Sequence, residues 1–234
     1  MSVHPILFNT EMVRAILAGR KTVTRRVVKP PVPKPCELRK MQEGYHAGEW
    51  HLYCEDPMLD NPNKSPWGAQ FLPPFQPWDI LYVRETWSTD ISDMCYAQTG
   101  ICPYESCDTA NGQCFRDVYI YKASDDVPEY GIKWRPSIHM PKEAARIFLR
   151  VTDVRAEMLQ PIKTDGCVDE GAVMKPHYTK RGDLCLHSRY KTEFSILWDS
   201  TIKKSDIDRY GWEANPWVWA IRFERCEKPE GWPQ

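Results

Sequence analysis

Apolar positions along the chain follow helical spacing in only three short segments. In the first, Met12, Ile16 and Leu17 repeat at the period of an α-helix. Asn9 precedes them as a helix cap, and Gly19 follows where a helix commonly ends. The pattern therefore predicts helices over about 10–18, 161–172 and 195–202.

Other segments are rich in the β-branched and aromatic residues that favour strands, over 5–8, 22–28, 80–84, 118–121, 147–154 and 217–223. Two long insertions separate them, at about 29–78 and 90–116. The first holds ten of the chain's 20 prolines, which exclude a long helix or a central strand. We therefore predict one α+β domain over 1–234, built as a small mixed β-barrel with a few short helices and long irregular insertions.

The composition is that of a folded protein without a membrane anchor. Hydrophobic residues make up 42% of the 234 positions and charged residues 27%. No apolar run approaches the ~20 residues that cross a bilayer, and the N-terminal segment lacks the features of a secretory signal. These features predict a cytoplasmic protein with no membrane association.

Charge is distributed unevenly, although the net charge is only -1. Nine basic residues and one acid lie between Arg14 and Lys40, whereas eight acids and two basic residues lie between Asp90 and Glu129. A near-neutral total excludes a histone-like protein but allows a local patch that contacts phosphate. The basic segment is the predicted contact with nucleic acid.

The nine cysteines form an odd set, which favours free thiols or metal ligands over a disulfide scaffold. Four of them cluster in the acidic insertion, and only the central pair has the spacing of a zinc knuckle. A structural zinc is one hypothesis for this cluster, and reduced thiols in a surface loop are the other. No other metal or cofactor is predicted. The four residues are Cys95, Cys102, Cys107 and Cys114.

One segment, 16–26, resembles the signature of ASCH domains. That pattern has a glycine, then a lysine, a polar residue and an arginine, and its positions are filled by Gly19, Lys21, Thr24 and Arg26. Three other stretches, 77–83, 159–171 and 215–223, are similar to the family's turn, later helix and closing strand, although Trp78 stands where glycine is usual. With 133–141 included, the layout resembles a phage- and prophage-encoded branch of the family.

The resemblance implies a β-barrel of the PUA-like superfamily that binds RNA or a modified nucleoside in a basic cleft. Some similar small proteins hydrolyse the amide of N4-acetylcytidine with a lysine, a threonine and a glutamate. Lys21 and Thr24 match the first two, and Glu170 would be the third, with Asp169 as its rival. Arg26 would neutralise an oxyanion or hold a phosphate.

Elementary chemistry is compatible with these roles under two conditions. Lys21 can act as a base for Thr24 only if its amine is neutral, which burial and nearby Arg25 or Arg26 would favour. A partly buried Glu170 could protonate the leaving amine. Residues three apart in a strand face opposite ways, so Lys21 must lie in the turn before the strand begins.

Four further residues are candidates for contacting a base, because they flank a strand end or lie in a loop. An aromatic ring beside a basic cleft can stack a base, and a carboxylate can accept from an exocyclic amine. The residues leave two alternatives open: a non-catalytic reader of RNA or modified bases, and a metal-independent ribonuclease using Lys21 and Arg26. The four candidates are Tyr82, Glu85, Trp87 and Trp134.

Overall fold

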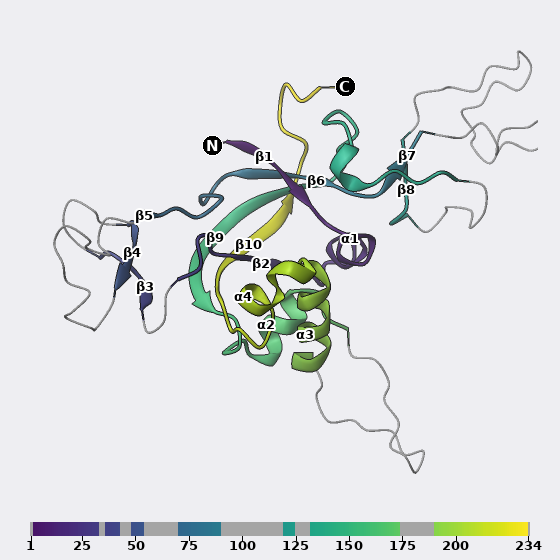
Figure 1. Ribbon diagram of the computed structural model, residues 1–234. Helices are drawn as coiled ribbons and strands as arrows, with labels where there is room; N and C mark the ends of the chain where they lie inside the picture. Colours follow the sequence, from purple (N-terminus) through teal and green to yellow (C-terminus); the bar gives the residue numbers. More distant parts are fainter. Residues whose placement is uncertain are drawn as a thin grey trace, which may run out of the picture. The chain divides into compact units, whose positions relative to one another are not determined.

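The protein is an α+β protein built around a mixed sheet of five strands (Figure 1). This computed structural model describes residues 2–32, 36–42, 48–53, 70–89, 119–124, 132–173 and 190–233. The strand order is β1-β6-β9-β10-β2, and no closed barrel is detected among these residues. The strands are β1 (Val3–Leu7), β2 (Val23–Val27), β6 (Ile80–Arg84), β9 (Phe148–Met158) and β10 (Trp217–Cys226).

The sheet is mixed because β1 pairs with β6 in parallel, whereas β10 pairs with β2 antiparallel. In the second pair, Thr24 is opposite Ile221 and Arg26 is opposite Trp219. The strand predicted over 80–84 has the observed bounds of β6. By contrast, β9 and β10 continue past the predicted ends at 154 and 223, where polar residues break the apolar pattern.

The Pro-rich segment was predicted to be irregular, but it forms a small sheet of its own. Its strands are β3 (Glu37–Lys40), β4 (Trp50–Tyr53) and β5 (Gln70–Phe71), in the order β3-β4-β5. All three are short and contain no proline, so each can supply the donors that the ladder needs. A second small sheet pairs β7 (Trp87–Ser88) with β8 (Ile120–Tyr121). The insertion at 90–116, with its four clustered cysteines, lies outside the described residues.

The described residues form four short α-helices: α1 (Thr10–Leu17), α2 (Thr164–Asp169), α3 (Tyr190–Thr201) and α4 (Ile207–Tyr210). Helix α1 begins as predicted, because the Asn9 side chain accepts a 2.9 Å hydrogen bond from the Met12 N–H. Helix α2 is shorter than predicted and ends with Glu170 as its cap, before Gly171 at φ 86°. None of the described helices is long and apolar enough to cross a membrane.

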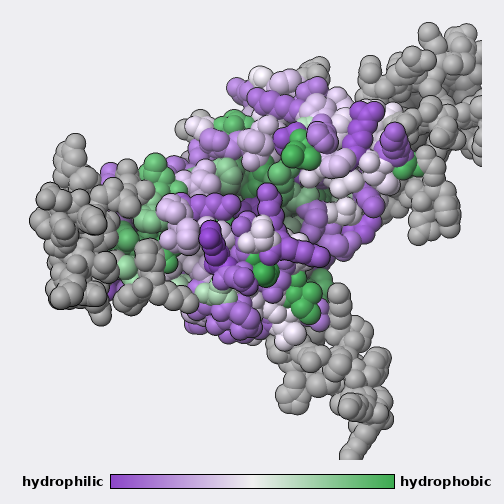
Figure 2. Space-filling view, in the orientation of Figure 1, coloured by the Kyte–Doolittle hydropathy of each residue, from purple (hydrophilic) through white to green (hydrophobic). Residues whose placement is uncertain are grey.

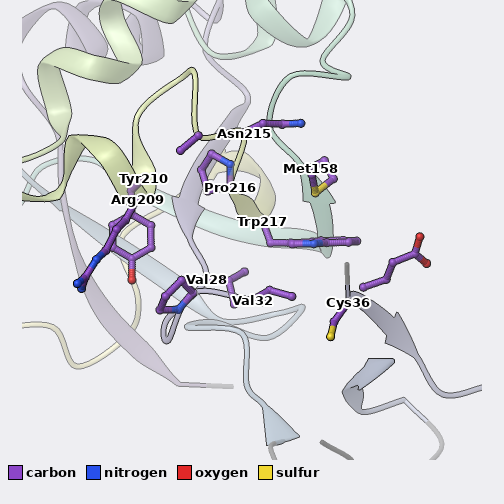
Figure 3. Close-up of a pocket in the computed structure, with 12 residues that line it drawn as sticks. Val28, Val32, Cys36, Met158, Arg209, Tyr210, Asn215, Pro216 and Trp217 are labelled. Carbon is purple, nitrogen blue, oxygen red and sulfur yellow. The ribbon is translucent and has the colours of Figure 1, made fainter. Parts of the chain in front are cut away.

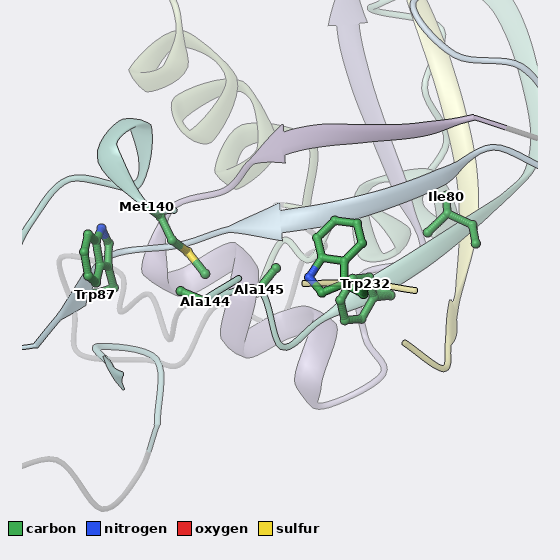
Figure 4. Close-up of a cluster of buried hydrophobic side chains, with 7 residues drawn as sticks. Ile80, Trp87, Met140, Ala144, Ala145 and Trp232 are labelled. Carbon is green, nitrogen blue, oxygen red and sulfur yellow. The ribbon is translucent and has the colours of Figure 1, made fainter. Parts of the chain in front are cut away.

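The chain divides into two compact units, and the prediction of a single domain stays a prediction. The first unit consists of 1–18, 80–149 and 225–234. Its apolar core gathers Trp87, Met140, Ala144 and Trp232 along β6 (Figure 4). Trp232 packs edge-on against Tyr82, with ring centroids 4.9 Å apart.

The second unit consists of 19–79 and 150–224, and it holds β2, α2, α3 and α4. Its core packs Phe194 and Trp198 of α3 against Cys167 of α2 and Val218 of β10. On the face drawn in Figure 2, polar and charged residues predominate and apolar residues form separate small patches. A 2.8 Å bond from Thr22 N–H, just before β2, to Asp169 O joins the end of α2 to the start of this strand.

Candidate active site

Lys21 lies in the short connection between α1 and β2, and its side chain is buried. Gly19 adopts φ 71°, a left-handed conformation that glycine tolerates, and β2 begins only at Val23. Lys21 therefore precedes the alternation of the strand, as the catalytic hypothesis requires. Its side chain is 0% exposed, so it is no part of a solvated basic surface.

The ammonium group of Lys21 makes three short contacts inside the second unit. Nζ donates to the carbonyl oxygen of Val23 at 2.8 Å and to that of Glu170 at 3.0 Å. The third contact is with the Glu170 carboxylate, whose Oε2 lies 2.6 Å from Nζ although the two residues are 149 positions apart. The structure thus joins two of the three residues predicted to be catalytic.

The environment of Lys21 disfavours its charged form. Burial lowers the pKa of Lys21 below its ordinary value of 10.5. The negative charge and hydrogen bond of Glu170 raise it in part, while the positive charges of Arg26 and Arg25 lower it further. A lowered pKa favours the neutral amine, and this is the form of lysine that can accept a proton.

Glu170 is held in place by backbone contacts at the end of α2. Its N–H donates to Gly166 O at 3.2 Å, and the Gly171 N–H donates to Val168 O at 2.7 Å. The preceding carbonyl, that of Asp169, accepts a 2.8 Å bond from the Thr22 N–H. That bond ties the end of α2 to the connection that carries Lys21.

A second cation, Arg25, extends the pair into a chain of alternating charges. Arg25 Nη1 lies 3.1 Å from Glu170 Oε1, and Nη2 lies 2.6 Å from Glu157 Oε1. Glu157 in turn accepts a 3.1 Å bond from Arg155 at the surface. Gly166 allows this approach, because a Cβ there would lie 3.4 Å from Arg25 Nη2 and 2.9 Å from Ile162 Cγ1.

The remaining signature residues, Thr24 and Arg26, belong to β2. Thr24 is buried, at 3% exposure. Burial lowers the pKa of Arg26 below its ordinary value, and the negative charge of Glu170 raises it in part. Arg26 remains a cation, as arginines in proteins do. The Glu170 carboxylate therefore interacts electrostatically with three basic side chains, those of Lys21, Arg25 and Arg26.

Asp169, the predicted rival of Glu170, has another partner. Its Oδ2 lies 3.4 Å from Nη2 of Arg222, and the two side chains are 33% and 45% exposed. Glu170 is 4% exposed and is the acid that contacts Lys21. Lys21 and Arg25, two of the basic residues predicted to contact phosphate, are buried against carboxylates.

The four residues predicted to contact a base belong to the first unit, whereas Lys21 and Glu170 belong to the second. Trp87 is a core residue, and Glu85 is 1% exposed with both oxygens bonded to Arg146, at 2.9 and 3.0 Å. Tyr82 packs on Trp232, and Trp134 is half-buried. Their predicted contacts with a base stay predictions.

A polar cavity of about 390 Å³ opens beside the outer end of the charge chain. Arg25 and Glu157 form part of its wall, together with Lys163 and Asp165 near the start of α2. Lys21, Thr24 and Glu170 are absent from that wall. The cavity therefore gives solvent access to Arg25 rather than to Lys21.

Metal ligands do not gather in the part of the chain that the structure describes: it contains no group of three or more His, Cys, Asp or Glu suited to a metal ion. Cys36 is disulfide-bonded, contrary to the expectation of free thiols or metal ligands, whereas Cys167 is a free buried thiol whose pKa is raised by burial. The zinc hypothesis concerns residues outside this part.

No family model, curated protein or solved structure matches the chain.

Two ion-pair partners, Glu157 and Arg146, could not be predicted from the sequence. Glu157 is 132 positions from Arg25 and Arg146 is 61 positions from Glu85, so no local spacing connects them. The case for function rests on the geometry around Lys21.

Proposed function

We propose that the protein hydrolyses the amide of a nucleoside of the N4-acetylcytidine type, within a fold of the ASCH, PUA-like kind. The observation that carries the proposal is the 2.6 Å contact between Lys21 Nζ and Glu170 Oε2, with the lysine fully buried. The substrate class comes from the resemblance around Gly19 to Arg26. The chemistry comes from the contacts of this pair.

One proton transfer along the 2.6 Å contact converts the ion pair into a neutral amine and a carboxylic acid. The amine keeps two N–H groups for the carbonyl oxygens of Val23 and Glu170, so burial leaves no donor unsatisfied. The transfer produces a base and an acid at the same time. Arg25 opposes it by stabilising the carboxylate, and its bond to Glu157 offsets part of that charge.

In the proposed reaction, Lys21 removes the proton of the Thr24 hydroxyl as Oγ1 attacks the acyl carbon. The amide C–N bond then breaks, and the Glu170 carboxyl group gives its proton to the departing N4 amine. Water hydrolyses the acyl ester on Thr24, releasing the acid, and the proton held by Lys21 returns to Glu170. The sum is one amide plus one water giving one acid and one amine.

Access to the pair requires a local opening, because the Lys21 side chain is 0% exposed and that of Glu170 is 5% exposed. The bond from Thr22 N–H to Asp169 O is the backbone contact that must loosen for the end of α2 to move away from Lys21. Gly171, which has φ 86°, follows Glu170 directly and can absorb a backbone rotation at the end of α2.

Burial also favours hydrolysis over the two alternatives. A reader or a ribonuclease would use its cations on phosphates, which are large and hydrated. Lys21 and Arg25 instead bond the carboxylates of Glu170 and Glu157 at 2.6 to 3.1 Å. A small, uncharged acyl amide fits such a site better than a phosphate does.

The test is to incubate the purified protein with N4-acetylcytidine and to follow cytidine by chromatography. Wild type should release cytidine, and Lys21→Met should lose about 10²- to 10⁴-fold in rate, the usual contribution of a general base. Thr24→Val, which removes only the hydroxyl, should abolish release. The matched control is Thr152→Val, at an exposed position of β9, which should leave the rate unchanged.

Folded wild-type protein that releases no cytidine from N4-acetylcytidine or other N4-acylated cytidines would overturn the proposal. Full activity of Thr24→Val would overturn the role of Thr24. In the first case, RNA binding measured across a salt series and cleavage of single-stranded RNA in the presence of chelator would distinguish a reader from a ribonuclease.

A further inference from the structure

A second cavity, of about 400 Å³, lies at the opposite end of β2 from Lys21, within the second unit. It opens at Val28, directly after the end of β2, and at Trp217, where β10 begins. A 3.0 Å bond from Val28 N–H to Trp217 O joins these two residues. Lys21, Thr24 and Glu170 do not line it. Its size falls within the usual range for small-molecule sites, roughly 300–1,000 Å³.

Flat apolar surfaces make up much of this cavity. The indole of Trp217 lies across it, with the Tyr210 ring to its left and Met158 above it in Figure 3. Tyr210 is held by its backbone, since its carbonyl oxygen accepts a 2.8 Å bond from Trp198 Nε1. A fixed, half-buried indole beside a thioether and a second ring suits a planar aromatic ligand.

Positive charge lies on the Tyr210 side of the cavity. Arg209 lines the cavity there, is exposed, and makes no ion pair with any described residue. Lys29 adds a second cation, with its Nζ 5.7 Å from the centroid of the Tyr210 ring. An anionic group on the ligand, such as a phosphate, would be stabilised at this side.

An acidic residue, Glu37, lines the cavity next to Cys36. In Figure 3, Cys36 and Arg209 lie on opposite sides of Trp217. Glu37 accepts two hydrogen bonds from Arg39, at 3.2 and 3.3 Å, and both reach the same oxygen, Oε2. Its other oxygen, Oε1, can accept a hydrogen bond from a ligand amine. Carboxylates read the N4 amine of cytosine in this way.

A polar group fixed by the backbone completes the wall. Asn215 adopts φ 45°, and its Oδ1 accepts a 2.8 Å bond from the Gln160 N–H. That bond orients the amide, so its NH₂ group remains a donor for a carbonyl oxygen on the ligand. The cavity thus combines a stacking surface with a cationic side, an acceptor and a donor.

We infer that this cavity binds a nucleoside monophosphate whose base carries an exocyclic amine. The base stacks on Trp217, the amine donates to Glu37, and the phosphate lies beside Arg209 and Lys29. Free nucleotide and a nucleotide within an oligonucleotide share this chemistry. The site is separate from the Lys21–Glu170 pair and does not depend on the amidohydrolase proposal.

The test is isothermal titration calorimetry of the full chain with CMP, AMP, UMP and IMP, and with cytidine and a cytidine dinucleotide. CMP or AMP should bind roughly tenfold or more tightly than UMP or IMP, because these two place an acceptor against Glu37. Glu37→Gln should remove this preference. Arg209→Ala should weaken CMP roughly tenfold and leave cytidine unchanged.

Arg225→Ala, an exposed arginine of the first unit, is the matched control and should bind CMP as wild type does. Trp217→Leu should lose binding, and Trp217→Phe should restore part of it. Binding of the dinucleotide but not of CMP would assign the site to a strand of RNA. Equal affinity for CMP and UMP, or no binding of any of these probes, would overturn the inference.

Discussion

In the described part of each unit a glutamate is buried against cations, and the two arrangements differ in their balance of charge. In the first unit Glu85 meets one arginine, Arg146, through two parallel bonds of 2.9 and 3.0 Å. In the second unit Glu170 meets Lys21 and Arg25. The first arrangement is complete with one charge of each sign, whereas the second places two cations on one carboxylate.

The type of cation decides what each arrangement can do. A guanidinium keeps its proton in proteins, so the Glu85–Arg146 pair can only remain an ion pair. A lysine amine can release its proton when it is buried. Lys21 is 0% exposed, whereas Arg146 is 31% exposed and in contact with water. We therefore interpret the first pair as structural and the second as reactive.

The largest effect should come from breaking the second pair. Glu170→Leu would leave Lys21 buried without its carboxylate, which typically costs about 3–5 kcal/mol in the free energy of unfolding. Urea denaturation measures the loss. The double variant Glu170→Leu/Lys21→Met should recover most of it. A single variant that is as stable as wild type would contradict the buried charge.

Removing only the charge of the glutamate in the first pair should cost less. Glu85→Gln keeps one acceptor for Arg146, whose exposed part can be hydrated, so we expect a loss of about 1–3 kcal/mol. The comparison uses the same urea measurement. A loss larger than that of Glu170→Leu would reverse the interpretation of the two pairs.

The pH dependence of stability should separate the two pairs further. Burial lowers the pKa of Lys21 in the folded state below 10.5, so the unfolded chain binds more protons as pH approaches that value. Stability should therefore rise with pH on account of Lys21. The raised pKa values of Cys167, normally 9.0, and of Tyr121, about 12 instead of 10.0, act in the opposite direction.

Comparing wild type with Lys21→Met from about pH 7 up to the ordinary lysine value of 10.5 cancels the contributions of Cys167 and Tyr121, which both proteins share. Wild type should gain stability over this range relative to Lys21→Met, and the variant should remove that gain. Parallel curves for the two proteins would mean that Lys21 keeps its ordinary pKa in the folded state.

The smallest effect is expected at an exposed pair that serves as a baseline. Arg150 and Glu224 approach to 3.5 Å, with side chains 39% and 58% exposed. Because water screens such pairs, Glu224→Gln should cost at most about 1 kcal/mol. A larger loss would show that exposed pairs contribute more than the baseline assumes.

Local signals in the sequence predicted the elements that depend on local contacts. The cap at Asn9 predicted the start of α1, and β-branched residues predicted β6 over 80–84. The sheet of β3, β4 and β5 was not predicted, because its strands of two to four residues are defined by pairing with one another. Such short strands form because they pair with neighbouring strands, and the periodicity of the sequence does not show this pairing.

The candidate site shows the same division. A resemblance suggested Lys21 and Glu170 together, and the structure joins them. Nothing in the sequence indicated that Glu157 contacts Arg25, which lies 132 positions away. Nor did it indicate that Lys21 and Arg25 share the Glu170 carboxylate. Contacts of that range depend on which distant elements lie near β2, and no local pattern encodes this.

The central claim is that Glu170, through its contact with Lys21, takes part in amide hydrolysis. The direct measurement compares cytidine release from N4-acetylcytidine by Glu170→Gln and by Asp169→Asn, the adjacent acid that pairs with Arg222. The account predicts that Glu170→Gln, confirmed as folded by circular dichroism, loses release while Asp169→Asn retains it. Equal rates for the two variants, or loss only in Asp169→Asn, would contradict it.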